Sequence, residues 1–245
     1  MTKGQNSARP EQDAERLVLG IDTCGPSGSV ALARLRQDEQ GSGMELLGQI
    51  ELAGRSYSAT LVAAVGELLS QSQRHMGLLH AMAVTSGPGS FTGVRVGLSA
   101  AKGLAEPGDI PLVAVSRLAA LAQKAGVDAA ALDAHRREVF LRLIGDEGGK
   151  PREFLAGQAD LEALPTPPAK IAVCDAAAME LLKVAWPRTE LIQVDAPTAA
   201  DAIELAAAQI CAGEFADLAL LDGQYLRRSD AEIFGIPSQV TNPRS

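Results

Sequence analysis

Aromatic residues and cysteines are scarce in this chain. Aromatics make up only 3% of the 245 residues, and the three cysteines are Cys24, Cys174 and Cys211. No two of them form a C-x-x-C pair and their number is odd, which excludes a disulfide framework and favours a reducing compartment. We therefore expect a cytoplasmic protein. Hydrophobic residues still make up 47% of the chain, so aliphatic side chains must fill a sizeable core.

Long apolar runs are also missing. No stretch of about 18 consecutive apolar residues occurs, so no transmembrane helix is predicted. Residues 1–16 are polar and charged and lack the apolar segment of a secretory signal. We expect them to be a disordered extension before the first strand.

Positive charge is in deficit. The net charge is −8, which argues against a protein that grips nucleic acid by itself. Arg136–Arg137 and Arg227–Arg228 are the local exceptions, and we interpret both pairs as solvated surface.

Recognisable catalytic motifs are absent as well. His75, His80 and His135 form no H-x-x-x-H or H-E-x-x-H pair, so no metal site is predicted. The chain has no Gly-Lys-Ser or Gly-Lys-Thr of a Walker A loop, and its glycines miss G-x-G-x-x-G by one residue. Gly89 and Ser90 are adjacent, which breaks the G-x-S-x-G spacing of a serine hydrolase. We expect no catalytic residue and no cofactor bound by this chain.

The most informative segment that is present is 86–97, Ser-Gly-Pro-Gly-Ser-Phe-Thr-Gly-Val-Arg-Val-Gly. It joins a predicted buried strand, 81–85, to a predicted helix, 91–105. Pro88 and Gly89 suit the central positions of a type II turn, which needs a positive φ at the second. Ser90 or Thr92 can cap the helix.

Such a helix start can hold an anion on its free backbone N–H groups. Gly87, Gly89 and Ser90 are therefore candidate phosphate or nucleotide contacts, together with Asp22 at the end of the first strand. An aspartate before a Gly-rich hairpin occurs in folds that handle ATP, but it also occurs where it only caps a turn. Both interpretations of Asp22 stay open.

Small residues recur every four positions along helix 91–105, which permits another helix to approach closely. The helix expected at 58–72 carries an apolar stripe at helical spacing. The small-residue ridge fits packing inside the monomer and a subunit interface equally well. The candidate interface residues are Leu61, Val65, Leu68, Leu69, Gly93, Gly97 and Ala101, with Ala105 continuing the ridge.

The order of predicted elements indicates an α/β protein of two tandem lobes, the second smaller and degenerate. The first lobe, 17–116, has three strands, then helix, strand, helix and strand. The second, 117–228, is less regular, and we expect its last helix, 198–212, to return to the first lobe. Residues 229–245 form a C-terminal tail. The expected strands are 17–22, 29–36, 45–52, 81–85, 111–115, 129–133, 138–144, 153–158 and 171–174, with further helices at 117–124 and 176–184.

Several segments resemble the bacterial TsaB family, also known as YeaZ, of the actin-like/Hsp70/sugar-kinase superfold. The resemblance covers residues 17–228, and the motif at 86–97 is its most specific part. The matching pieces are Leu19–Thr23, Ser29–Leu32, Ser86–Gly97, Ala101–Ala105, Pro111–Leu118, Leu132–Phe140 and Tyr225–Arg227.

The resemblance implies a non-catalytic scaffold subunit. It would partner TsaD, the metal-bearing homologue, in placing a threonylcarbamoyl group on the adenosine next to the anticodon of tRNA, with the ATPase TsaE completing the complex. The complex would hold tRNA and ATP or ADP, and the subunit alone would form a homodimer. From the small-residue ridge and the apolar stripe, we expect the two helices 58–72 and 91–105 to form the surface that meets this partner or, in its absence, a second copy of the chain. This chain has Tyr57-Ser58-Ala59 where the family has a His-Ser-Glu-like triplet, which puts any role of that histidine or glutamate in doubt.

Two other functions remain open. One is an independent ATP-dependent enzyme of the same superfold, such as a sugar kinase, for which Asp133 is the strand-end candidate in the second lobe. The other is a peptidase, against which the missing histidine pair and serine triad both weigh.

Overall fold

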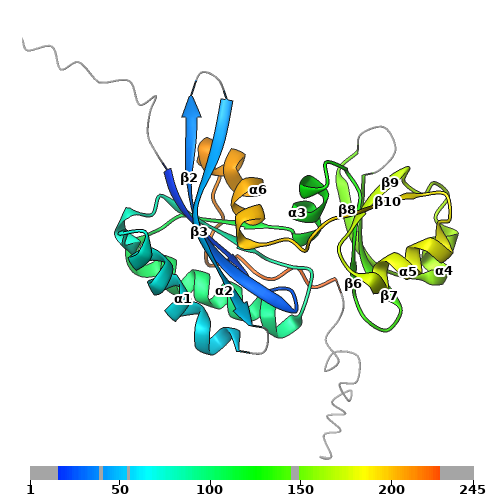
Figure 1. Cartoon of the computed structure of the whole chain (residues 1–245), viewed down its shortest axis with the longest axis horizontal. Coiled ribbons are helices and arrows are strands. Elements are labelled where there is room, and N and C mark those ends of the chain that lie inside the picture. Colours follow the sequence, from blue (N-terminus) through cyan, green and yellow to red (C-terminus); the bar gives the residue numbers. More distant parts are fainter. Residues whose placement is uncertain (1–15, 39–40, 54–55, 145–148, 227–245) are drawn as a thin grey trace, which may run out of the picture.

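A computed structural model describes residues 16–38, 41–53, 56–144 and 149–226, which form two lobes, each built on a five-stranded sheet (Figure 1). The expected extension 1–16 lies almost wholly outside these residues, as do the tail 229–245 and the pair Arg227–Arg228. Among the described residues, no helix is long and apolar enough to cross a membrane.

The first sheet has the strand order β3-β2-β1-β4-β5. Its first three strands are antiparallel neighbours, whereas β4 and β5 run parallel to β1. Helices α1 and α2 cover one face and bury most of their leucines and valines against it. The elements are β1 (Arg16–Asp22), β2 (Ser27–Asp38), β3 (Gly41–Ala53), α1 (Tyr57–Gln71), η1 (Met76–Leu78), β4 (Ala81–Thr85), α2 (Phe91–Ala105), η2 (Glu106–Gly108) and β5 (Leu112–Val115).

The second sheet repeats this topology. Its order, β10-β9-β6-β7-β8, places an antiparallel trio β6-β7-β8 beside the parallel strands β9 and β10. Helices α4 and α5 pack against it. The elements are α3 (Arg117–Lys124), β6 (Ala130–Asp133), β7 (Glu138–Ile144), β8 (Pro151–Gly157), α4 (Gln158–Ala163), β9 (Lys170–Val173), α5 (Ala176–Ala185), β10 (Glu190–Gln193) and α6 (Ala199–Ala212).

The helix that follows each sheet in the sequence packs against the sheet of the other lobe. α3 comes after the first sheet but packs against the second, and α6 comes after the second sheet but packs on the first (Figure 1). Alanines on the buried side of α6 bring its backbone close to β1, where a side chain at Gly20 would collide with the carbonyl of Ala199. Thr198 and Asp201 form a capping box that begins α6.

The predicted two-lobe α/β fold is confirmed. Four short elements, η1, η2, α4 and β10, were not among the expected ones. Segments of three to six residues carry little periodicity that could separate them from a loop. The predicted type II turn is wrong. The Gly87–Pro88 peptide bond is cis, and the positive φ of 117° belongs to Gly87, not to Gly89.

Candidate functional site

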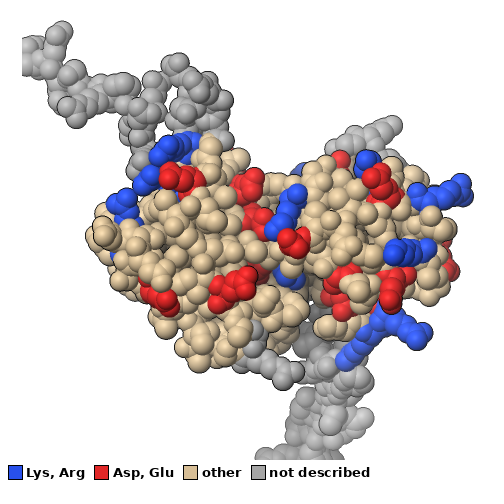
Figure 2. Space-filling model, in the orientation of Figure 1, with Lys and Arg blue, Asp and Glu red and all other residues tan. Residues whose placement is uncertain are grey.

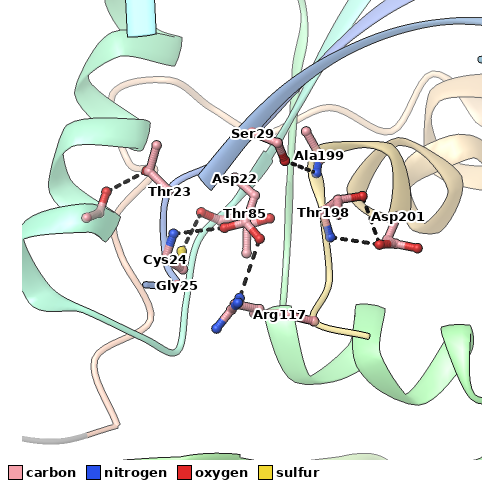
Figure 3. Close-up of polar contacts among 12 residues, drawn as sticks. Asp22, Thr23, Cys24, Gly25, Ser29, Thr85, Arg117, Thr198, Ala199 and Asp201 are labelled. Atoms are coloured by element: carbon pink, nitrogen blue, oxygen red, sulfur yellow. Dashed lines mark hydrogen bonds and ion pairs between the residues drawn. The ribbon is translucent and has the colours of Figure 1, made fainter. Parts of the chain in front are cut away.

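The turn after β1 is the most densely bonded polar feature of the first lobe (Figure 3). The Asp22 side chain is only 1% exposed, and its Oδ1 accepts the Cys24 N–H at 2.8 Å. Thr23 Oγ1 donates to the Gly93 carbonyl at 2.7 Å, and Cys24 Sγ donates to the Thr85 carbonyl at 3.4 Å. These bonds tie the turn to the start of α2 and to the end of β4.

The glycines of segment 86–97 permit this contact. A side chain at Gly89 would meet the Cys24 carbonyl, and one at Gly93 would meet the Thr23 carbonyl. Ser90 caps α2, because its Oγ accepts the Gly93 N–H at 3.3 Å, while its own N–H donates to the Cys24 carbonyl at 2.9 Å. The motif therefore lets the start of α2 pack directly on the backbone of the turn after β1.

Arg117, at the first position of α3, supplies the charge partner of Asp22. Its Nε lies 3.4 Å from Asp22 Oδ2, and the residue is only 5% exposed. Burial by itself would lower the pKa of the guanidinium, but the carboxylate of Asp22 reverses the effect, and the pKa is raised. The Arg117 N–H also donates to the Gly87 carbonyl at 2.7 Å.

The four candidate phosphate contacts are thus engaged within the chain. Asp22 faces a guanidinium, Gly89 packs on the turn, Ser90 caps its own helix, and the surface of Gly87 is covered by the Gln224 carbonyl. An aspartate at this depth, paired with an arginine, carries no free charge for a metal–phosphate group. The contacts of Asp22 therefore support a role in holding the turn, not a role in binding ATP.

A second buried cluster lies next to Arg117. The carboxylate of Glu153, on β8, accepts hydrogen bonds from Ser116 Oγ at 2.7 Å, from Arg142 Nη1 at 2.9 Å and from Gln224 Nε2 at 2.6 Å. Ser116 is the N-cap of α3. Sequence reasoning missed both Arg117 and Glu153. The only signal was the Ser-Arg pair at the start of a predicted helix, which does not reveal its distant partners.

The surroundings of Cys24 and Tyr57 keep both side chains protonated, so we expect neither to act as a nucleophile or a base. Burial first, and Asp22 second, raise the pKa of the Cys24 thiol well above its ordinary value and that of Tyr57 to about 12. The Tyr57 hydroxyl donates to the Gly25 carbonyl at 2.8 Å.

We therefore expect iodoacetamide at pH 8 to leave Cys24 unmodified in the folded protein, because alkylation requires the thiolate. Peptide mass spectrometry should show three alkylated cysteines after denaturation. Alkylation of Cys24 in the native protein at a rate close to that of the denatured chain would contradict this.

The predicted interface residues lie inside the first lobe, which corrects that assignment. All seven are buried in the monomer: the leucines and Val65 pack between α1 and the sheet, and a side chain at Gly97 would meet Thr23 Oγ1. The small-residue ridge thus serves close packing of α2 on the turn after β1. The seven residues are Leu61, Val65, Leu68, Leu69, Gly93, Gly97 and Ala101.

The outer sides of the same two helices form a groove of about 400 Å³. Val62 of α1 is 58% exposed beside it. The side chains on the α2 side of the groove, Ser99 and Ala100, are small. The lining residues are Tyr57, Ser58, Leu61, Val62, Arg95, Val96, Ser99 and Ala100. Within the part of the chain that the structure describes, no group of three or more His, Cys, Asp or Glu side chains is placed to hold a metal ion.

Comparison with known proteins decides the family. Residues 49–213 match the family model described as TsaD, tRNA N6-adenosine threonylcarbamoyltransferase.

The chain belongs to the TsaD family.

Its curated relatives include the tRNA threonylcarbamoyladenosine biosynthesis protein TsaB of Haemophilus influenzae, 40% identical over 38% of this chain and 42% of the relative. The TsaB protein of Escherichia coli is 35% identical over 50% of this chain and 52% of the relative. The chain thus spans about half the length of these relatives. YeaZ from Pseudomonas aeruginosa superposes with a TM-score of 0.64 and 27% identity, covering 86% of this chain and all of that one. These similarities confirm the TsaB (YeaZ) family that the sequence motifs indicated.

Proposed function

We propose that this chain is a non-catalytic subunit of the bacterial complex that transfers a threonylcarbamoyl group to the adenosine next to the anticodon of tRNA. It would act as a scaffold and activator of a TsaD-like catalytic subunit. The names of its TsaB relatives support the pathway. One contrast supports the scaffold role. The polar groups at the end of β1 are paired within the chain, whereas the groove on α1 and α2 is open.

The occupant we assign to this groove is a TsaD-like subunit of the same fold, and in its absence a second copy of this chain. A partner with the same topology would present the same two helices, so two pairs could pack ridge into groove. Exposed apolar side chains such as Val62 would then be removed from water. The TsaE-like ATPase, ATP or ADP, and tRNA would be engaged through the assembled complex.

The alternative of an independent ATP-dependent enzyme has less support. A phosphate placed at Asp22 would have to displace Arg117, which is buried and hydrogen-bonded through its backbone to Gly87. Asp133, the kinase candidate of the second lobe, instead accepts the His135 N–H at 2.8 Å and holds the turn after β6. An ATPase rate that disappears in Asp22→Ala would restore this alternative.

A charge placed in the groove tests the scaffold role. We expect Val62→Glu to weaken binding to the TsaD-like subunit at least about 100-fold, because a buried unpaired carboxylate costs about 3 kcal/mol or more. Its melting temperature should stay unchanged, since Val62 is exposed in the monomer. The measurement is co-purification followed by titration of the two purified subunits.

Val184→Glu is the matched control. Val184 is 64% exposed on α5, in the other lobe, so it receives the same charge without touching the groove. If both variants bind the TsaD-like subunit as tightly as the unchanged chain does, the groove is not the contact surface. An equal loss in both would point to a general charge effect.

A further inference from the structure

Arg95 is the one charged side chain among the described residues that line the groove on α1 and α2, beside the apolar Leu61, Val62 and Val96. It is exposed in the monomer, so water solvates its charge there. On the face drawn in Figure 2, the region where Figure 1 places the two helices is mainly uncharged. A partner that covers the groove would take this guanidinium out of water. A buried charge without a counter-charge is strongly unfavourable, so the partner must supply one.

Two aromatic rings hold the Arg95 side chain in place. Phe91 precedes it by four residues and therefore lies on the same side of α2. The guanidinium carbon is 3.8 Å from the centroid of the Phe91 ring and 5.7 Å from that of the Tyr225 ring, and the two centroids are 5.0 Å apart. Arg95 Nε also donates to the Tyr225 hydroxyl at 3.3 Å. The guanidinium is thus positioned before a partner arrives, so its ordering costs little conformational entropy on binding.

These contacts leave one edge of the guanidinium for a ligand. Tyr225 uses Nε, whereas Nη1 and Nη2 of Arg95 have no acceptor and no acidic partner among the described residues. Two parallel N–H groups match the two oxygens of a carboxylate. A phosphate fits less well, because the described lining of the groove carries no second cation. The other cation of α2, Lys102, donates to the Leu221 carbonyl.

We propose that Arg95 determines the specificity of the groove by pairing with a carboxylate of the TsaD-like subunit. One Asp or Glu side chain of the partner would accept hydrogen bonds from Nη1 and Nη2, while apolar side chains of the partner cover Val62 and Val96. A partner surface without this carboxylate would leave the guanidinium buried and unpaired, so the groove selects against it. The inference rests on the proposed function, because it concerns the same groove and the same partner.

Two substitutions at Arg95 test the pairing. Arg95→Gln removes the charge and Arg95→Glu reverses it. The melting temperatures of both variants should stay close to that of the unchanged chain, because the side chain is exposed in the monomer. The control is Arg188→Glu, which makes the same reversal at an exposed position just after α5, in the other lobe. Each full chain is titrated with the purified TsaD-like subunit.

We expect Arg95→Gln to weaken binding at least about 30-fold, chiefly through faster dissociation, as when one member of a buried charge pair is removed. Arg95→Glu should weaken it further, since it sets two carboxylates against each other. Arg188→Glu should bind like the unchanged chain. An equal loss in Arg188→Glu and Arg95→Glu would mean a general charge effect and would overturn the pairing.

Reversing the partner's charge identifies the carboxylate. The exposed Asp and Glu residues of the TsaD-like subunit are changed to Arg one at a time, and each variant is titrated with Arg95→Glu and with the unchanged chain. We expect one of them to bind Arg95→Glu at least about tenfold more tightly than the unchanged subunit does, and to bind the unchanged chain more weakly. If none restores binding, Arg95 does not pair with a carboxylate of this partner.

The remaining outcomes separate this inference from the proposed function. Binding that survives in both Arg95 variants but is lost in Val62→Glu would keep the groove as the contact surface and overturn the pairing. If Arg95→Glu abolishes self-association in sedimentation but leaves binding to the TsaD-like subunit intact, the carboxylate belongs to a second copy, and the assignment is wrong. An unchanged chain that never binds the TsaD-like subunit would overturn the proposed function and the pairing with it.

Discussion

Gly93→Ala is expected to destabilise the folded chain by about 3 kcal/mol or more, enough to unfold a marginal protein at 37 °C. The added methyl would overlap the backbone carbonyl of Thr23, and backbone at this position cannot rotate away as a flexible side chain would. Overpacking a tight core typically costs about 1–3 kcal/mol, and here the two backbones must separate. Separation would also break the bond from Thr23 Oγ1 to the Gly93 carbonyl. Urea denaturation followed by circular dichroism measures the change.

Gly103→Ala, on the same helix, is the control. A side chain there meets nothing within 4 Å, so the variant should gain about 0.5–1 kcal/mol from helix propensity. Similar stability changes in the two variants would mean that the start of α2 tolerates a side chain, and the packing role of the 86–97 motif would be lost.

Arg117→Met is expected to lower stability by about 3–5 kcal/mol, because it leaves the Asp22 carboxylate buried without its partner. The loss should affect both lobes, since Arg117 begins the helix that packs on the second sheet while its side chain lies against the first. Thermal denaturation at pH 7 measures it.

The double variant Asp22→Asn/Arg117→Met tests the cause. The introduced amide would keep an oxygen for the Cys24 N–H while removing the charge, so we expect most of the lost stability to return. A double variant as unstable as Arg117→Met would show that packing of the arginine, not charge pairing, is what matters. Recovery together with new ATP binding would instead show that Arg117 blocks a nucleotide site.

Sequence reasoning recovered most elements, because their apolar residues alternate or recur at helical spacing. Strands such as Ala81–Thr85 and the helix Phe91–Ala105 match the structure residue for residue. The N-cap role of Ser90, one of the two candidates, was also predictable, since capping is local. The spacing of Gly93 and Gly97 revealed a close contact but not its partner, because a ridge of small residues has the same pattern whether a helix, a turn or another subunit lies on it.

Residues that are neighbours in the chain were enough to establish the lobes, their order of elements, the family and the absence of familiar catalytic motifs. Folding was needed to show that Arg117 neutralises Asp22 from 95 positions away, and that α3 and α6 are exchanged between the sheets. It was also needed to show that the inner stripe of α1 and α2 is core while their outer sides form a groove. Burial and charge pairing are set by distances between residues remote in the chain, and these distances exist only once the chain has folded.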